Sequence, residues 1–282
     1  MRTAHYIAIA SAILLIALLY WGGNTTPPRK TMAQPNMAGA MAPGPVTMKP
    51  ASFDSILTAS GKQLPAKAAA QVATIENELK ANRDSSRMAS VFLKLAKVYE
   101  ENKLLPVAGY YSALAAKLDN SEKMLTFAAQ FFLDRTGETE SASVQQWEIG
   151  QAEDCFERAS KLAPDNDTPK IGLATCYIAK GETMKGVGML RDITQKEPDN
   201  IPANMLLGQL SIQSGQLDKA IVRFETIVRL DPKNADAMLY LAETYEKKGD
   251  KGKAIEWYNK TRIIVDNPEF RANIDKHINS LK

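Results

Sequence analysis

Three prolines, Pro164, Pro198 and Pro232, lie thirty-four residues apart, and the sequence around each of them repeats. A fixed period of this size is typical of a chain built from small structural units stacked in a row. In such an array each unit buries its apolar face only against its neighbours, so the period constrains the fold directly. The spacing predicts a stack of helical hairpins.

The three repeats share one arrangement of small and large side chains. A large–small pair opens each repeat, a glycine follows it, and a small residue then precedes a large one by four positions. The residues are Leu173-Ala174, Gly181, Gly186 and Leu190; Leu207-Gly208, Gly215, Ala220 and Phe224; and Leu241-Ala242, Gly249, Ala254 and Tyr258. Small residues let two helices approach and large ones fill the gap between them, while glycine favours the left-handed conformation that ends a helix.

This set of residues resembles the tetratricopeptide repeat (TPR) family, whose pattern is W-x2-L-G-x2-Y, then A-x3-F, then P. Tyr177 and Tyr245 match the tyrosine, and Ser211 replaces it in the middle repeat. The tryptophan position is occupied by other residues in all three, namely Lys170, Asn204 and Met238. The resemblance implies an all-α fold, an α-solenoid of stacked antiparallel helix hairpins.

Two looser repeats come before these three. In the first of them, we expect Leu95-Ala96 to be the large–small pair and Tyr99 to be the aromatic residue that follows it. In the first helix of the second, we expect Phe127-Ala128 and Phe131 at the same positions. The second also carries an insertion of about a dozen residues relative to the family spacing. We expect part of it to lengthen the following helix, with Ser143 and Gln146 as a capping box, and 134–143 to form a protruding polar loop. Five repeats result, with a closing helix over 267–281 and a further helix over 66–81 in front.

The amino-terminal region differs in composition. Residues 1–21 contain an apolar, uncharged stretch that would span about 27 Å as a helix, and Tyr20 and Trp21 end it, which is typical of a membrane anchor. A cleaved signal peptide is the alternative. Residues 22–65, rich in Pro, Ala and Met, are expected to be a flexible, disordered linker, in which Phe53, Ile56 and Leu57 form either a local turn or a short helical contact. Residues 66–282 are the repeat domain.

The side of the membrane that the repeats occupy depends on the charges near the anchor. Arg2 favours an amino terminus in the cytoplasm, with the repeats outside it, whereas Arg29 and Lys30 favour the opposite orientation. We expect a periplasmic or otherwise extracytoplasmic repeat domain, and the cytoplasmic alternative stays open.

The composition and the motifs argue against a nucleic-acid-binding surface, an enzyme and a metal or cofactor site. The net charge is only +3 and the charges are mixed in sign, which is unlike a nucleic-acid-binding surface. Two histidines, His5 and His277, lie at opposite ends of the chain, and no phosphate-binding loop or metal-spaced Cys/His cluster occurs. We therefore expect no enzyme activity, metal or cofactor. Cys155 and Cys176 fall on neighbouring helices, so either a disulfide or two free thiols fits the pattern.

The resemblance to the family implies that the first helix of each repeat lines a concave groove that holds a protein or peptide. Nine residues occupy the groove positions of three repeats: Ile171, Thr175, Ile178, Met205, Gln209, Ile212, Leu239, Glu243 and Glu246. They are mostly aliphatic and amide side chains with an acidic end, which suits a segment that carries hydrophobic anchors and some basic charge. The alternative is that the apolar members only pack between repeats.

These observations predict a non-catalytic interaction scaffold that is tethered to a membrane and binds a partner protein through its groove. The layout of anchor, linker and repeats resembles membrane-anchored bacterial TPR proteins, including envelope assembly factors. The competing hypothesis is a self-assembling structural protein, in which repeats of neighbouring chains pair into homo-oligomers.

Overall fold

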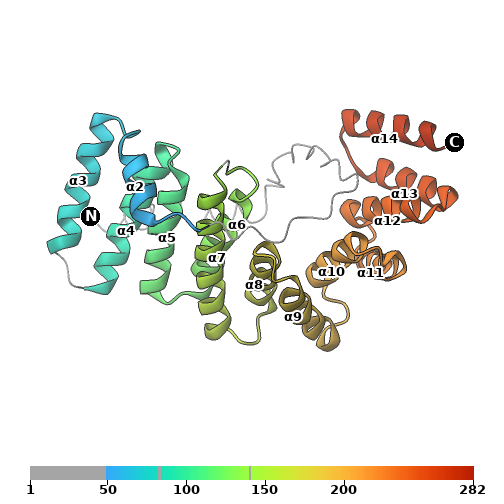
Figure 1. Cartoon of the computed structure of the whole chain (residues 1–282), viewed down its shortest axis with the longest axis horizontal. Helices are drawn as coiled ribbons and strands as arrows, with labels where there is room; N and C mark the ends of the chain where they lie inside the picture. Colours follow the sequence, from blue (N-terminus) through green and yellow to red (C-terminus); the bar gives the residue numbers. More distant parts are fainter. Residues whose placement is uncertain (1–48, 82–83, 140) are drawn as a thin grey trace, which may run out of the picture. The chain divides into compact units, whose positions relative to one another are not determined.

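The computed structural model describes residues 49–81, 84–139 and 141–282, and these residues form thirteen helices and no strand (Figure 1). The helices are α2 (Phe53–Gly61), α3 (Ala66–Ala81), α4 (Ser85–Glu101), α5 (Leu105–Asp119), α6 (Glu122–Arg135), α7 (Ala142–Leu162), α8 (Asp167–Ala179), α9 (Thr183–Lys196), α10 (Ile201–Gln213), α11 (Leu217–Leu230), α12 (Ala235–Lys248), α13 (Lys251–Ile264) and α14 (Pro268–Leu281). The predicted all-helical solenoid is confirmed.

The anchor predicted over residues 1–21 and most of the linker lie outside the described residues. Among the helices that are described, none has the length and apolar character needed to cross a bilayer.

Helices α4 to α13 form five consecutive pairs, and the members of each pair pack against each other. Each pair also contacts the next one, because the second helix of one repeat packs on the first helix of the following repeat. Helix α3 covers α4 at one end, and α14 covers α13 at the other. Ile274, Ile278 and Leu281 form the buried face of α14, so the last helix closes the stack with one apolar side.

The predicted glycine caps are present. Gly181, Gly215 and Gly249 have φ angles of 87°, 73° and 87°, which are left-handed values that favour glycine. Lys103 takes the same place in the first repeat with a φ of 60°. The residue after each cap donates its N–H to a carbonyl five residues earlier, as Gln216 does to Ser211 at 2.8 Å. Each first helix therefore ends in the same sharp turn.

The small residues allow the close helix contacts that the sequence predicts. A Cβ atom on Gly208 would lie 2.6 Å from the ring of Phe224, and one on Gly172 would lie 2.3 Å from the ring of Phe156. Both rings are fully buried. Because there is no room for even a methyl group between ring and backbone, these contacts fix how closely the helices approach.

The second repeat differs from the prediction by one residue. Helix α6 buries Ala128, Ala129 and Phe132, whereas Phe127 is 73% exposed. The pair that we assigned to Phe127-Ala128 is therefore Ala128-Ala129, and Phe132 takes the place we gave to Phe131. The error arose because alanine fills both positions of the pair, so the neighbouring phenylalanine was taken for the missing large residue.

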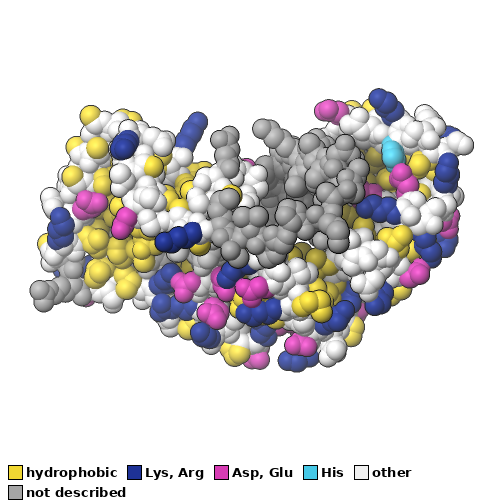
Figure 2. All heavy atoms as spheres, in the orientation of Figure 1, with side chains coloured by type: hydrophobic (Ala, Val, Ile, Leu, Met, Phe, Trp, Pro, Cys, Tyr) yellow, Lys and Arg dark blue, Asp and Glu magenta, His cyan; other side chains and the backbone are white. Residues whose placement is uncertain are grey.

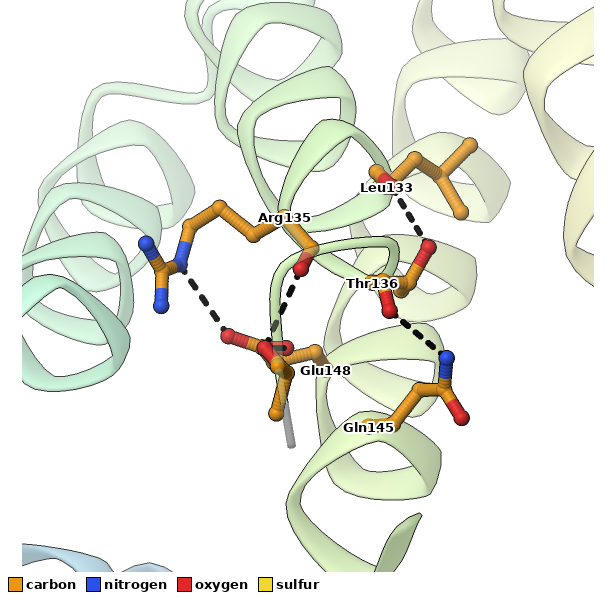
Figure 3. Close-up of polar contacts among 6 residues, drawn as sticks. Leu133, Arg135, Thr136, Gln145 and Glu148 are labelled. Atoms are coloured by element: carbon orange, nitrogen blue, oxygen red, sulfur yellow. Dashed lines mark hydrogen bonds and ion pairs between the residues drawn. The ribbon is translucent and has the colours of Figure 1, made fainter. Parts of the chain in front are cut away.

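The insertion in the second repeat is mostly helix, and the remaining turn is tied down rather than protruding (Figure 3). Glu148 is completely buried on α7 and accepts hydrogen bonds from Arg135 Nε at 3.1 Å and Thr139 Oγ1 at 2.7 Å. Gln145 Nε2 donates to the carbonyl of Thr136 at 2.6 Å. A buried carboxylate needs such partners, so Glu148 ties Arg135 and Thr139 to α7.

The capping box predicted for Ser143 and Gln146 is wrong. Helix α7 begins two residues earlier, with Ser141 as the N-cap and no side-chain capping bond. The carbonyl of Ser143 instead accepts a hydrogen bond from the N–H of Ala51 at 2.9 Å. This bond attaches the segment in front of α2 to the start of α7.

Phe53, Ile56 and Leu57, which we placed in the linker as either a local turn or a short helical contact, lie on helix α2. Phe53 stacks on Tyr110 with ring centroids 3.6 Å apart and lies 6.0 Å from Trp147. Ile56 is buried in the same core. Aromatic contacts of this kind add stabilisation beyond the buried area, so α2 belongs to the folded array.

Two glycine substitutions test the packing. Gly208→Ala should lower the free energy of unfolding by about 1–3 kcal/mol, because the added methyl group overlaps the Phe224 ring. Gly188→Ala should raise it by about 0.5–1 kcal/mol, because Gly188 lies inside α9 with open space around it. Urea unfolding followed by circular dichroism measures both. Equal effects of the two substitutions would contradict this packing.

Candidate functional site

The nine predicted groove residues lie on the first helices α8, α10 and α12, at corresponding positions one repeat apart. All nine are partly buried: none is fully exposed and none is completely enclosed. Equivalent positions of the three repeats lie thirty-four residues apart, as Thr175, Gln209 and Glu243 do. The first-helix face therefore presents equivalent positions on three consecutive repeats.

The apolar members take part in packing between repeats. Ile171 and Ile178 pack on the cluster that contains Leu190 and Leu207. Met205, Ile212 and Leu239 pack on the cluster of the last two repeats, which contains Leu241. These five side chains thus support the stack, and each also keeps an accessible part. The polar members Thr175 and Gln209 lie between them; the Thr175 hydroxyl donates to the carbonyl of Ile171 at 3.0 Å.

At the acidic end, Glu246 is engaged within the chain. Its Oε2 accepts a hydrogen bond from the Tyr258 hydroxyl at 2.8 Å and lies 2.8 Å from His277 Nε2. The Tyr258 and His277 rings also meet edge to face, with centroids 5.0 Å apart. Glu246 therefore joins α12 to α13 and α14, a role that the sequence pattern did not indicate.

The pKa values of the two groove carboxylates, Glu243 and Glu246, are shifted in opposite directions. Burial raises the pKa of Glu243, and the neighbouring Glu246 adds to this increase against the opposing effect of Lys247. Burial also raises the pKa of Glu246, but hydrogen bonds from His277 and Tyr258 outweigh it and bring that pKa below its ordinary value. Ionised Glu243 thus opposes folding, while ionised Glu246 favours it.

The two cysteines lie in surroundings that favour the protonated thiol. Both are buried and free. Burial raises the pKa of Cys155 to about 11 and that of Cys176 to about 12, so both are protonated thiols at neutral pH, and a thiol is a weaker nucleophile than a thiolate. Within the described ranges, no three His, Cys, Asp or Glu side chains are grouped so that they could hold a metal ion.

A second candidate surface lies on the first two repeats. Leu93, Ser112, Lys123, Met124, Phe127 and Ala128 line a shallow, mostly apolar pocket between α4, α5 and α6, which we call the Phe127 pocket. Another apolar pocket lies between α3 and α4, with Ile75 and Val98 in its lining. In Figure 2, hydrophobic side chains gather over α3 to α5, while acidic and basic side chains alternate over α7 to α9.

The same region of sequence that shows the repeats also matches a protein family. The family model described as tetratricopeptide repeat matches residues 144–210 and 211–272. This match supports the resemblance of these residues to the tetratricopeptide repeat family. The matched residues include α8 to α13 and all nine predicted groove residues. A search of the curated proteins finds no match.

Two solved structures with TM-scores of at least 0.50 show the same fold at low sequence identity. The crystal structure of PilW, a type IV pilus biogenesis factor, is 16% identical with a TM-score of 0.50, and the alignment covers 79% of this chain and 99% of PilW. The Cut9–Hcn1 hetero-tetramer of the APC/C is 17% identical with a TM-score of 0.51, over 79% of this chain and 40% of the other. YrrB, a TPR protein with an unusual peptide-binding site, is 20% identical with a TM-score of 0.44, over 72% and 97%.

Two glutamine substitutions test the carboxylates. Above an ordinary carboxyl pKa of 4.5, Glu243→Gln should stabilise the chain, because it removes a disfavoured buried charge. Glu246→Gln should destabilise it, because the stabilisation by ionised Glu246 is present above pH 4.5 and is lost as the pH falls through the lowered pKa. Unfolding midpoints measured from pH 3 to pH 7 check this. The difference in stability between each variant and the unaltered chain should shrink toward pH 3. Stability changes of the same sign for both variants at pH 7 would contradict the opposite roles of Glu243 and Glu246.

Proposed function

We propose that the chain is a non-catalytic scaffold, tethered to a membrane by its amino-terminal segment, that binds a partner protein along the first-helix face. The observation that carries the proposal is the recurrence of half-buried apolar, amide and carboxylate side chains on α8, α10 and α12. A surface of equivalent positions repeated at regular intervals suits an extended or helical segment, which makes the same contacts repeatedly.

The membrane part of the proposal is supported by sequence. Residues 1–21 are apolar and are followed by a proline-rich segment, which suits an anchor and a spacer that lets the repeats reach partners near the bilayer. We place the repeats outside the cytoplasm. A reporter enzyme fused after Lys282, active in only one compartment, tests this side of the membrane.

A role in assembling an envelope structure is the narrower form of the proposal. PilW, which shares the fold, is a pilus biogenesis factor. Since fold alone does not carry function, the narrower form depends on the partner that the first-helix face binds.

The binding face is tested by paired substitutions in the membrane-tethered chain. Thr175→Arg combined with Gln209→Arg should reduce crosslinking of the partner by at least about tenfold, because two bulky charges then interrupt the face on α8 and α10. The matched control is Met184→Arg with Val222→Arg, which changes residues that are 77% and 63% exposed on the second helices α9 and α11.

Quantitative mass spectrometry of crosslinked membranes gives the result, and circular dichroism confirms that helicity is retained. Loss of the partner in the control but not in the Thr175/Gln209 variant would place binding on the second helices. A tight oligomer of the purified chain that the same arginines dissolve would favour the self-assembling alternative.

A further inference from the structure

The Phe127 pocket brings two exposed apolar side chains together. Phe127 on α6 is 73% exposed and Leu93 on α4 is 42% exposed, and with Met124 they form adjoining apolar walls. By comparison, Phe132, Phe156 and Phe224 are completely buried. One exposed apolar side chain needs no explanation, but several around one pocket are typical of a surface that binds something.

The buried residue of the pocket lining is small. The first residue of the large–small pair is leucine in four repeats, as in Leu95 and Leu173, but it is Ala128 in the second. Ala128 is buried and lines the pocket. Helices α4 and α6 both pack on α5, which contributes Ser112 to the lining. Phe127, the residue before Ala128, points outward.

The charged side chain that lines the pocket is positive. Lys123 precedes Phe127 by one helical turn, so it lies on the same face of α6, and it lines the pocket itself. Lys97 follows Leu93 by one turn on α4. The carboxylate of Glu101 is 3.9 Å from Lys97 Nζ, so these two opposite charges add no net charge to the rim. An apolar pocket whose lining carries one charged side chain, that of Lys123, is complementary to an apolar anchor flanked by carboxylates.

We propose that the Phe127 pocket binds an acidic segment of a partner protein, in which a large apolar side chain enters the pocket between flanking Asp or Glu residues. This inference rests on the proposed scaffold function and names the chemistry of the partner. It also extends the binding surface from repeats three to five, where the acidic Glu246 is already engaged by His277, to the first two repeats.

The chain itself offers poorer occupants. Residues 1–48 contain Arg2, Arg29 and Lys30 but no Asp or Glu, so this segment would bring positive charge to a positive rim. A second copy bound through the same face would bring another surface carrying Lys123 to the pocket and no added carboxylates, because a two-fold interface pairs identical surfaces. Both arrangements lack the charge complementarity that a partner with carboxylates provides.

The experiment uses the full-length chain in a mild detergent and two fluorescein-labelled helical peptides. Both peptides carry the same leucine and phenylalanine anchors, flanked by glutamates in one and by lysines in the other. Fluorescence anisotropy should show that the glutamate peptide binds at least about tenfold more tightly, with an affinity that falls as salt is added. Equal binding of the two peptides would contradict the proposal.

Two variants locate the binding, each with a matched control. Phe127→Ser should weaken the glutamate peptide by at least about tenfold, while Ile263→Ser, at a residue 74% exposed on α13, should change it less than about twofold. Lys123→Glu should weaken the glutamate peptide and strengthen the lysine peptide, and Lys276→Glu on α14 should do neither. Variants that match their controls would place the binding elsewhere.

The outcomes separate this inference from the proposed function. If Phe127→Ser leaves partner crosslinking in membranes intact while the Thr175 and Gln209 substitutions abolish it, the pocket assignment is wrong and the scaffold remains. If Phe127→Ser dissolves a dimer seen by sedimentation, a second copy occupies the pocket and the acidic partner is excluded.

Discussion

The contact between a large ring on one helix and a small residue on the facing helix determines the rest of this structure. Phe224 lies against Gly208 and Phe156 against Gly172, with no space for a methyl group between them. Such contacts set the distance between helices and bring each pair into a fixed relation with the next. Equivalent positions on α8, α10 and α12 then recur regularly, and a repeated face of this kind is what a scaffold needs.

Much of this fold could be predicted because its rules are local. The glycines Gly181, Gly215 and Gly249 end helices through their own backbone freedom, and the predicted bounds of α3 match the structure. The N-caps Asn166, Asn200 and Asn234 recur at thirty-four residues, a local signal that the sequence contains and that we did not use to place helix starts. Phe127 was misplaced because a one-residue shift of the pattern is decided by burial, which the pattern alone does not show.

The candidate site was less predictable because its properties depend on distant segments. The nine positions follow from the repeat and the family resemblance, and their role in binding stays a prediction. Glu246 is held by His277, thirty-one residues later, and the Phe127 pocket combines residues of α4, α5 and α6. Likewise, α2 is recognised as part of the array only when Phe53 is seen against Tyr110 and Trp147. No local pattern indicates such contacts.

The most direct test of the scaffold hypothesis is hydroxyl-radical footprinting of the membrane-tethered chain with and without its partner. Side-chain oxidation reports exposure at the first helices through Leu93, Phe127 and Met205, and at the second helices through Met184 and Val222. We predict that the partner protects the first group and leaves the second group unchanged. Protection of Met184 and Val222 with unchanged oxidation of the first group would contradict the hypothesis.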